Sequence, residues 1–401
     1  WQTIDIDNGE EVELGLRIML DGTTSTGEAI YRWRTNGVLF GTTPTVARTY
    51  SAPGDIDISL TVYNQGATQN TLVTKTIHVA EGMELIETIP GGTGVVSGVS
   101  ILNDIAWAVG INPGSIRTVA LAAQGGSTAL SDTDIPNSVY DFAVSPTLVA
   151  VSTLASGLVN LFDATDPEHL GTANEYDVHL GSACPVAYNL EFVGQRYLYI
   201  ACGNGIEIVD LLSPASPVLL GLYTAAGGVQ DEMKAVENLV YVATGSLSAG
   251  PANPPRIKVL DVTDPTHPVV VGQIDVERRA RSIAISGNVL AVAENESNLS
   301  YSTGTVAIFD LSQSPSQPQF KGRVGDNLTV YRGVAIVGNS VFSNDGSGIH
   351  KIDIARLDDP YFVSQASFGG FAPALAAYGD KLIMGSFDST DLSIIRTSLQ
   401  P

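Results

Sequence analysis

The chain has 401 residues, 44% of them hydrophobic, and a formal net charge of −22 at pH 7. This length favours two domains, and the hydrophobic content is enough for a sizeable buried core. The negative charge excludes nucleic acid and anionic membrane surfaces as partners, because both would repel the chain. We attribute the acidity to the solubility of a secreted protein, with a dedicated cation-binding role as the alternative.

Glycine is frequent, with 41 residues, and many glycines stand beside Asn, Asp, Ser or Pro at regular intervals. Such clusters are typical of turns between short strands. No long stretch has apolar residues at a sustained 3.6-residue period, and no apolar run reaches about 18 residues. We therefore expect an all-β protein without a membrane span.

The segment at residues 5–11 is similar to half of a calcium-binding loop. Asp5, Asp7 and Glu10 place oxygen ligands near one another, and Gly9 lies between them. Hard oxygen ligands suit Ca²⁺, but no bidentate Glu follows at the required distance. We expect no cofactor, with Ca²⁺ at these three residues as the alternative.

Residues 1–81 are predicted to form one β-sandwich. Strand-like segments cover residues 11–20, 29–34, 45–50, 55–63 and 72–79, and turn clusters separate them. Between residues 55 and 63 apolar and polar residues alternate, which directs one face of that strand into a core. Trp33 lies in the middle of a strand, where a sandwich core needs a large side chain.

The run Arg48-Thr49-Tyr50-Ser51-Ala52-Pro53-Gly54 and the strand after it resemble the end of polycystic-kidney-disease-type (PKD) domains, which are immunoglobulin-like. Tyr31-Arg32-Trp33 resembles the aromatic strand of that family. The resemblance covers residues 10–81. It departs after Trp33, where the family has an acidic turn and this chain has Arg34-Thr35-Asn36-Gly37.

From residue 83 to residue 401 the chain repeats one plan of four strands. The third strand of the clearest units ends in Asp, at positions 163, 210, 261, 310 and 353, so the period is 43 to 51 residues. Four strands in such a period are the signature of a propeller blade. We predict seven blades, at residues 95–135, 138–178, 186–225, 229–276, 281–324, 329–368 and 372–398.

The last of these units has only three strands. The segment Leu85-Ile86-Glu87-Thr88-Ile89 matches the outer strands of other units, such as Val270-Val271-Gly272-Gln273-Ile274. An open ring would leave two unpaired strand edges. We therefore expect residues 84–89 to complete the blade formed by residues 372–398.

The units with Ile206–Asp210 and Ile257–Asp261, each followed by a Pro-containing turn, resemble the LVIVD-repeat propellers of bacterial and archaeal surface proteins. The resemblance implies a propeller fold and says little about chemistry. The repeated Asp has its own explanation, because its carboxylate can accept backbone N–H bonds in the following turn. The alternative is a repeated metal site, although no second carboxylate recurs in register.

Aligned units place seven residues at one level around a mouth of the central channel. They are Ser97, Tyr140, Asn189, Asp231, Arg281, Arg332 and Pro373, with Arg278 close to Arg281. One hypothesis is a binding site for an anion or carboxylate, with Arg281 and Arg332 as bidentate donors. The alternative, which we favour, is an internal Asp–Arg network that fills the channel.

The two cysteines, Cys184 and Cys202, lack the spacing of a zinc site. Pairing of the strands around residues 194–196 brings them close enough for a disulfide, and two buried thiols are the alternative. The segments at residues 245–255 and 294–305 are predicted to be long loops, either for binding or as plain insertions. Asn295, Asn298 and Asn327 begin sequons for N-glycosylation, and such triplets also arise by chance.

Catalysis finds little support in the sequence. The five His residues are scattered, and none is in a recognisable arrangement with Ser or Cys. We expect a non-catalytic extracellular or cell-surface protein that binds and scaffolds through protein–protein or protein–glycan contacts. The alternatives are a subunit of an extracellular filament or sheath that assembles head to tail, and a polysaccharide hydrolase or lyase acting at the channel.

Overall fold

The computed structural model describes residues 2–4, 11–23, 29–64, 66, 70–80, 82–123, 125–153, 158–171, 174–177, 187–202, 205–224, 232–245, 254–298, 301–328, 333–344, 348–368, 374–386 and 389–398. All regular structure in these ranges is β-strand. They contain no helix that could cross a membrane. The chain divides into two compact units, one built mainly from residues 1–84 and the other from residues 85–361 and 365–395.

The smaller unit contains two sheets. The five-stranded sheet has the order β2 (Glu11–Glu13), β8 (Asn70–Ala80), β7 (Gly54–Asn64), β4 (Ala29–Thr35), β5 (Val38–Gly41), and the three-stranded sheet has the order β1 (Gln2–Ile4), β3 (Ile18–Asp21), β6 (Thr45–Arg48). Both sheets contribute to one core that includes Leu20 and Leu60 and the fully buried Trp33. The indole N–H of Trp33 donates to the Thr43 carbonyl oxygen at 2.9 Å, so the anchoring role expected for this residue is confirmed.

One strand prediction in the smaller unit is wrong. Residues 11–20 form two strands, β2 and β3, and these belong to different sheets. Gly15 lies between them with φ of 83°, a conformation that favours glycine, and there the chain leaves one sheet for the other. Strand β5 was not predicted.

The larger unit is a β-propeller, and seven four-stranded sheets lie in its described residues. In chain order the sheets are β10 (Val95–Leu102), β11 (Ile105–Ile111), β12 (Gly114–Ala120), β13 (Thr128–Ile135); β14 (Val139–Val144), β15 (Leu148–Thr153), β16 (Leu158–Asp163), β17 (Asn174–Asp177); β18 (Asn189–Val193), β19 (Tyr197–Cys202), β20 (Gly205–Asp210), β21 (Val218–Thr224); β22 (Met233–Val236), β23 (Leu239–Thr244), β24 (Arg256–Asp261), β25 (Val269–Asp275); β26 (Ala280–Ser286), β27 (Val289–Asn298), β28 (Tyr301–Asp310), β29 (Gln319–Leu328); β30 (Val334–Val337), β31 (Ser340–Asn344), β32 (Ile349–Asp353), β33 (Tyr361–Ala366); and β34 (Ala374–Tyr378), β35 (Lys381–Gly385), β36 (Leu392–Arg396), β9 (Glu84–Ile89).

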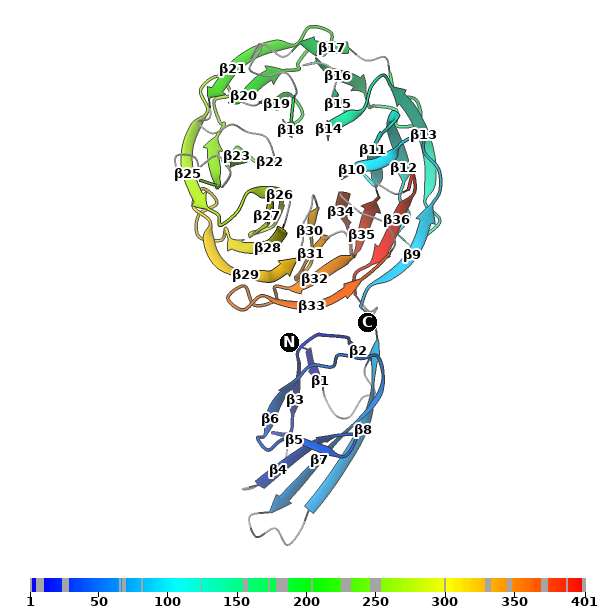
Figure 1. The fold of residues 1–401 in the computed structure, drawn as a ribbon, viewed down its shortest axis with the longest axis vertical. Helices are drawn as coiled ribbons and strands as arrows, with labels where there is room; N and C mark the ends of the chain where they lie inside the picture. Colours follow the sequence, from blue (N-terminus) through cyan, green and yellow to red (C-terminus); the bar gives the residue numbers. More distant parts are fainter. Residues whose placement is uncertain are drawn as a thin grey trace. The chain divides into compact units, whose positions relative to one another are not determined.

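The sheets are arranged as a ring, with the first strand of each near the centre and the fourth at the rim (Figure 1). Apolar cores lie between neighbouring sheets. One core, for example, joins Leu161 of β16 to Leu198 of β19, and another joins Tyr241 of β23 to Leu290 of β27. Each sheet is therefore buried on its faces by the two neighbours in the ring, which explains the nearly continuous apolar runs of the second strands.

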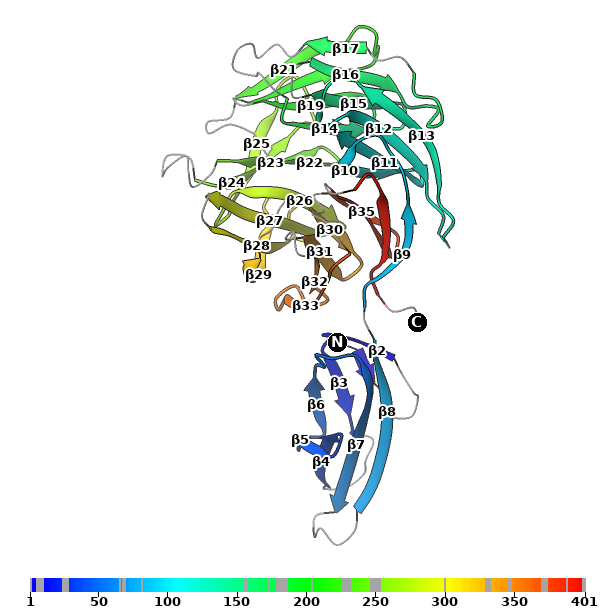
Figure 2. The ribbon, with the colours of Figure 1, turned by 45° about the vertical axis from the view of Figure 1, so that its right-hand side comes forward.

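Strand β9 closes the ring. It lies beside β36 at the outer edge of the last sheet, as the sequence predicted (Figure 2). Arg396 of β36 donates to the Glu84 carboxylate of β9 at 2.8 Å. Ile89 joins residues of the first and last sheets, such as Val119 and Ile394, in one core. The sheet that closes the ring thus combines the beginning and the end of the larger unit.

A buried arginine holds this junction together. The guanidinium of Arg117, on β12 of the first sheet, donates to the carbonyl oxygens of Ile89, Pro90 and Gly91, and to that of Thr390 just before β36. Burial lowers the pKa of Arg117, and the nearby carboxylates of Asp132 and Asp391 oppose this effect. One side chain therefore joins the first sheet to both segments of the last.

The repeated Asp at the end of the third strand in five sheets forms the expected turn. One carboxylate oxygen accepts the backbone N–H two residues later in every case, at 2.8 to 3.1 Å, and the acceptors are Asp163, Asp210, Asp261, Asp310 and Asp353. The pKa values of Asp163 and Asp261 are lowered, first by the bond from the Thr side chain two residues on. The turn interpretation is confirmed, because each of these carboxylates accepts a backbone N–H in the turn.

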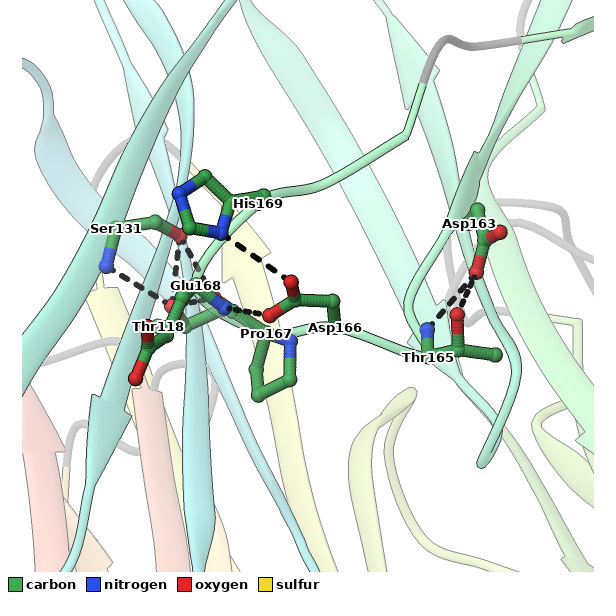
Figure 3. A network of polar contacts seen from close by, with 8 residues as sticks. All are labelled: Thr118, Ser131, Asp163, Thr165, Asp166, Pro167, Glu168 and His169. Atoms are coloured by element: carbon green, nitrogen blue, oxygen red, sulfur yellow. Dashed lines mark hydrogen bonds and ion pairs between the residues drawn. The ribbon is translucent and has the colours of Figure 1, made fainter.

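These turns also connect neighbouring sheets. The Pro167 carbonyl oxygen, in the turn after β16, accepts bonds from the hydroxyls of Thr118 and Ser131 in the preceding sheet, at 2.6 and 3.0 Å (Figure 3). In the same figure Asp166 accepts the Glu168 N–H at 2.9 Å and contacts His169. The turn is thus held in place while its carbonyl group faces the preceding sheet.

A glycine in several outer strands makes room for the turn of the following sheet. Gly221, Gly272 and Gly322 each lie at a β-bulge, opposite an apolar residue of the third strand. A Cβ atom on Gly272 would overlap the Ser316 carbonyl oxygen, whereas one on Gly221 would lie 3.0 Å from the Pro265 carbonyl oxygen. In these sheets the repeat thus combines a turn fixed by Asp with a glycine, in the outer strand of the preceding sheet, that leaves space for that turn.

We expect Gly272→Ala to destabilise the protein by about 2 kcal/mol, because the added methyl group displaces a backbone carbonyl. Gly221→Ala is the matched control and should cost less, since its nearest neighbour is farther away. Urea unfolding of both variants measures the difference. Equal stability of the two variants would contradict the role of Gly272 as the closer sheet-to-sheet contact.

Arg117→Met should lower the free energy of unfolding by about 3 kcal/mol, since it leaves buried carbonyl groups without their donor. Arg196→Met provides the control, because Arg196 pairs with Asp210 at an exposed position on the propeller. The control should change stability little. Thermal unfolding followed by circular dichroism distinguishes the two, and similar melting temperatures would show that Arg117 is not required for closure.

Candidate functional site

A polar cavity of about 300 Å³ occupies the centre of the propeller. Residues from the first strand of every sheet line it, so the cavity is the central channel around which the ring is built (Figure 1). Because these strands come from seven parts of the chain, the wall combines residues that are far apart in the sequence.

Four members of the predicted ring line this cavity: Ser97, Tyr140, Asn189 and Arg281. Three others, Asp231, Arg332 and Pro373, lie outside the described residues. Glu232, next to Asp231, does line the cavity. Arg278 is not part of the described wall, and its guanidinium lies 3.9 Å from the Glu277 carboxylate.

Polar side chains of the wall bond one sheet to the next. Asp141 of β14 accepts the Asn189 side-chain amide at 2.9 Å and the Leu190 backbone N–H at 2.7 Å. Asn189 of β18 in turn accepts the Met233 N–H at 2.8 Å, and Glu191 accepts the Ala235 N–H at 2.8 Å. This part of the wall is therefore an internal network. The Asp–Arg network that the sequence favoured stays a prediction, because Asp231 and Arg332 lie outside the described residues.

A lysine lies among carboxylates in the same part of the wall. The Lys234 ammonium is 3.5 Å from the Glu191 carboxylate. The negative charge of Glu191 raises the pKa of Lys234 most, and Glu232 and Asp141 add to the effect. Both signs of charge are thus present in the described lining, with Arg281 contributed by β26.

The carboxyl group of Asp141 is a much weaker acid than an ordinary aspartic acid. Burial raises its pKa to about 7, and the negative charge of Glu191 adds to the rise. The backbone bonds from Leu190 and Phe142 and the positive charge of Lys234 oppose it. Asp141 therefore exchanges its proton near neutral pH.

Two aromatic rings stand together in the lining. Tyr140 lies on β14, and Tyr188 lies directly before β18 of the next sheet. Their ring centroids are 5.5 Å apart with an interplanar angle of 74°. Edge-to-face pairs of this kind are favourable and hold both rings in place. The sequence alignment placed Tyr140 in the ring, but it did not identify Tyr188, Asp141, Glu191 or Lys234. In the sequence, only the polar or aromatic character of these four residues, in or beside otherwise apolar first strands, could have indicated a place in the wall.

Cys202 lies fully buried at the end of β19, and it is disulfide-bonded. The only other cysteine in the sequence is Cys184, which lies outside the described residues. The pairing of Cys184 with Cys202 stays a prediction for that reason.

The segment predicted as a loop at residues 294–305 is instead the end of a long hairpin. Strands β27 and β28 pair from Val289 with Asp310 through to Asn298 with Tyr301. Glu294 is buried there and receives two bonds from the Arg323 guanidinium, at 2.9 and 3.1 Å. Continuous strand pairing and a buried ion pair account for the difference. Most of the other predicted loop, at residues 245–255, lies outside the described residues.

The three sequons differ in their surroundings. The side chain of Asn295 is buried, with only 3% exposed, so the folded chain does not present it for modification. Asn298 and Asn327 lie on β27 and β29, and their side chains are outside the described part of the structure. The proposed calcium ligands Asp5, Asp7 and Glu10 are also outside it. Within the described ranges, no group of three or more His, Cys, Asp and Glu residues could hold a metal ion.

Comparison with protein families finds the LVIVD repeat at residues 188–225 and 277–326. A comparison with curated protein sequences finds no match. Both matched segments lie in the propeller, and they support that fold.

Solved structures similar to this chain include propellers of different origin. The Cps50 (Swd1) β-propeller domain of Myceliophteria thermophila matches with a TM-score of 0.59 at 12% identity, covering 79% of this chain and all of that domain. Raptor of Chaetomium thermophilum matches with a TM-score of 0.60 at 13% identity, covering 80% of this chain and 29% of that one. BamB of Moraxella catarrhalis matches with a TM-score of 0.51 at 11% identity, covering 80% and 99%. At such identities the likeness shows the fold alone.

The raised pKa of Asp141 predicts how stability depends on pH. Between about pH 4 and pH 7 the unfolded chain releases this proton and the folded protein keeps it, so the protein loses stability as pH rises, by up to about 4 kcal/mol. Asp141→Asn cannot release a proton and should gain stability relative to the wild type across this window. Urea unfolding at pH 4.5 and pH 7.5 measures the gain, and parallel curves for the two proteins would contradict the shift.

Proposed function

We propose that the chain consists of an immunoglobulin-like domain of the PKD type, residues 1–81, followed by a seven-bladed LVIVD-like propeller, residues 83–401. The two sheets around Trp33 support the first assignment. The four-stranded sheets, with β9 completing the last, support the second. The propeller is the rigid part on which binding surfaces are built.

The function we propose is non-catalytic binding and scaffolding at the cell surface or outside the cell, through contacts with proteins or glycans. The observation that carries it is an apolar rim on the outer strands of three consecutive sheets. Val218 of β21, Val269 of β25 and Phe320 of β29 are 55%, 57% and 53% exposed. Apolar side chains on an exposed strand edge offer a surface to another molecule, and soluble proteins commonly keep such edges polar.

The extracellular location rests on the chemistry of Cys202. Disulfides persist in oxidising compartments, and a disulfide-bonded Cys202 fits a secreted protein. The acidic composition is consistent with the same setting.

We propose a non-catalytic function because carboxylates of the channel accept backbone hydrogen bonds that join neighbouring sheets. Asp141 and Glu191 each hold a backbone N–H of the next sheet. A hydrolase or lyase that acts on polysaccharide is the alternative, and the near-neutral pKa of Asp141 favours it as a general acid. Turnover of a polysaccharide that is lost in Asp141→Asn would establish that alternative.

A filament or sheath subunit is the other alternative, and the edge strand β5 favours it. Val38 and Leu39 of this strand are 70% and 49% exposed, and β5 is the last strand of its sheet. Such an edge can add a strand or a sheet face from another copy. Electron microscopy of the purified chain would show polymers, and Val38→Lys should abolish them.

The rim is tested with the double variant Val218→Lys, Val269→Lys, which puts charge on two neighbouring outer strands. We expect it to lose binding to arrays of extracellular proteins and glycans while its melting temperature is unchanged, because the replaced side chains are exposed. Leu72→Lys, an equally exposed apolar position in the smaller unit, is the matched control and should bind like the wild type.

Two results would count against this function. Undiminished binding by the double variant would exclude the rim as the interaction surface. Equal loss in Leu72→Lys would indicate a general effect of added charge.

A further inference from the structure

We propose that the central cavity binds an uncharged saccharide. This deepens the proposed binding function, because it assigns a ligand class to one site of the propeller, separate from the rim. The inference rests on the charges, the aromatic rings and the size of the described lining.

The charged residues of the wall are mixed in sign. Asp141, Glu191 and Glu232 are acidic, and Lys234 and Arg281 are basic. A strongly anionic or cationic ligand would meet like charge in this lining, and part of its own charge would stay uncompensated. A hydroxyl group can donate to a carboxylate and accept from an ammonium or guanidinium at the same time. A ligand rich in hydroxyl groups therefore suits this wall better than an ion.

The aromatic residues supply the second requirement. Tyr140 of β14 and Tyr188, directly before β18, both line the cavity, and their edge-to-face contact fixes both rings. Phe142 and Phe192 lie in the same lining. Sugar rings have apolar C–H faces as well as polar edges, so a wall that offers aromatic rings beside charged groups can contact both.

The volume of the cavity limits the size of the ligand. At about 300 Å³ the cavity is at the lower end of the range for small-molecule sites. It has room for roughly one or two sugar rings, so a monosaccharide, a disaccharide or the end of a glycan chain would fit.

Saturation-transfer NMR and calorimetry with the full chain test the proposal. The probes are glucose, galactose, N-acetylglucosamine and their β-linked disaccharides, with glucuronate and lysine as anionic and cationic comparisons. At least one neutral sugar should bind more tightly than either comparison. Tyr140→Ala should weaken that binding about tenfold, and Tyr140→Phe, which keeps the ring, should stay within about threefold.

A second pair of variants covers the case in which Tyr140→Ala fails to fold. Glu232→Gln removes a charged acceptor from the wall and should weaken sugar binding about tenfold. Glu168→Gln makes the same change at an exposed turn and should have no effect. The proposal is overturned if no neutral sugar binds, if glucuronate or lysine binds more tightly, or if the folded wall variants bind like the wild type. Sugar binding lost in Glu232→Gln but kept in the rim variant would separate this site from the proposed rim function.

Discussion

Closure of the ring is the constraint on which the rest of the propeller depends. A ring built from consecutive sheets is complete only when its first and last sheets meet. Here the last sheet takes its outer strand, β9, from the beginning of the unit, and Arg117 of the first sheet bonds the carbonyl groups on both sides of that junction. Four carbonyl acceptors gathered on one buried guanidinium make this join specific, since no shorter or uncharged side chain could reach them all.

Inside the ring the same few contacts recur between sheets. The Asp-fixed turn of one sheet packs against the outer strand of the sheet before it. Gly272 shows how close this contact is, since even a methyl group there would overlap the Ser316 carbonyl oxygen of the turn after Asp310. These contacts lie toward the rim, whereas apolar cores fill the space between sheets farther in. The angle between neighbouring sheets is thus set by backbone contact as well as by side-chain packing.

At the centre, hydrogen bonds between first strands hold neighbouring sheets together, and the same residues shape the cavity. Asp141, Asn189 and Glu191 each reach a backbone N–H of the following sheet. The same lining contains Tyr140, Tyr188, Glu232 and Arg281, which belong to the wall that we propose contacts a ligand. One ring of side chains therefore joins the first strands and also forms the wall of the cavity.

The sequence alone determined what depends on local pattern. The four-strand repeat, the Asp turns and the strand that completes the last sheet were all predictable, because each follows from a period, a turn residue or a match between short segments. Tyr140, Asn189 and Arg281 could be placed on one wall for the same reason. The tertiary structure decided the rest. The acceptors of Arg117 come from the beginning and the end of the propeller sequence. Glu294 is buried by a hairpin that is longer than the sequence indicated. The raised pKa of Asp141 is due to burial and to the charge of Glu191 in another sheet. The partners in these contacts are far apart in the sequence, so no local pattern indicates them. Burial and through-space charge arise only when distant segments are brought together.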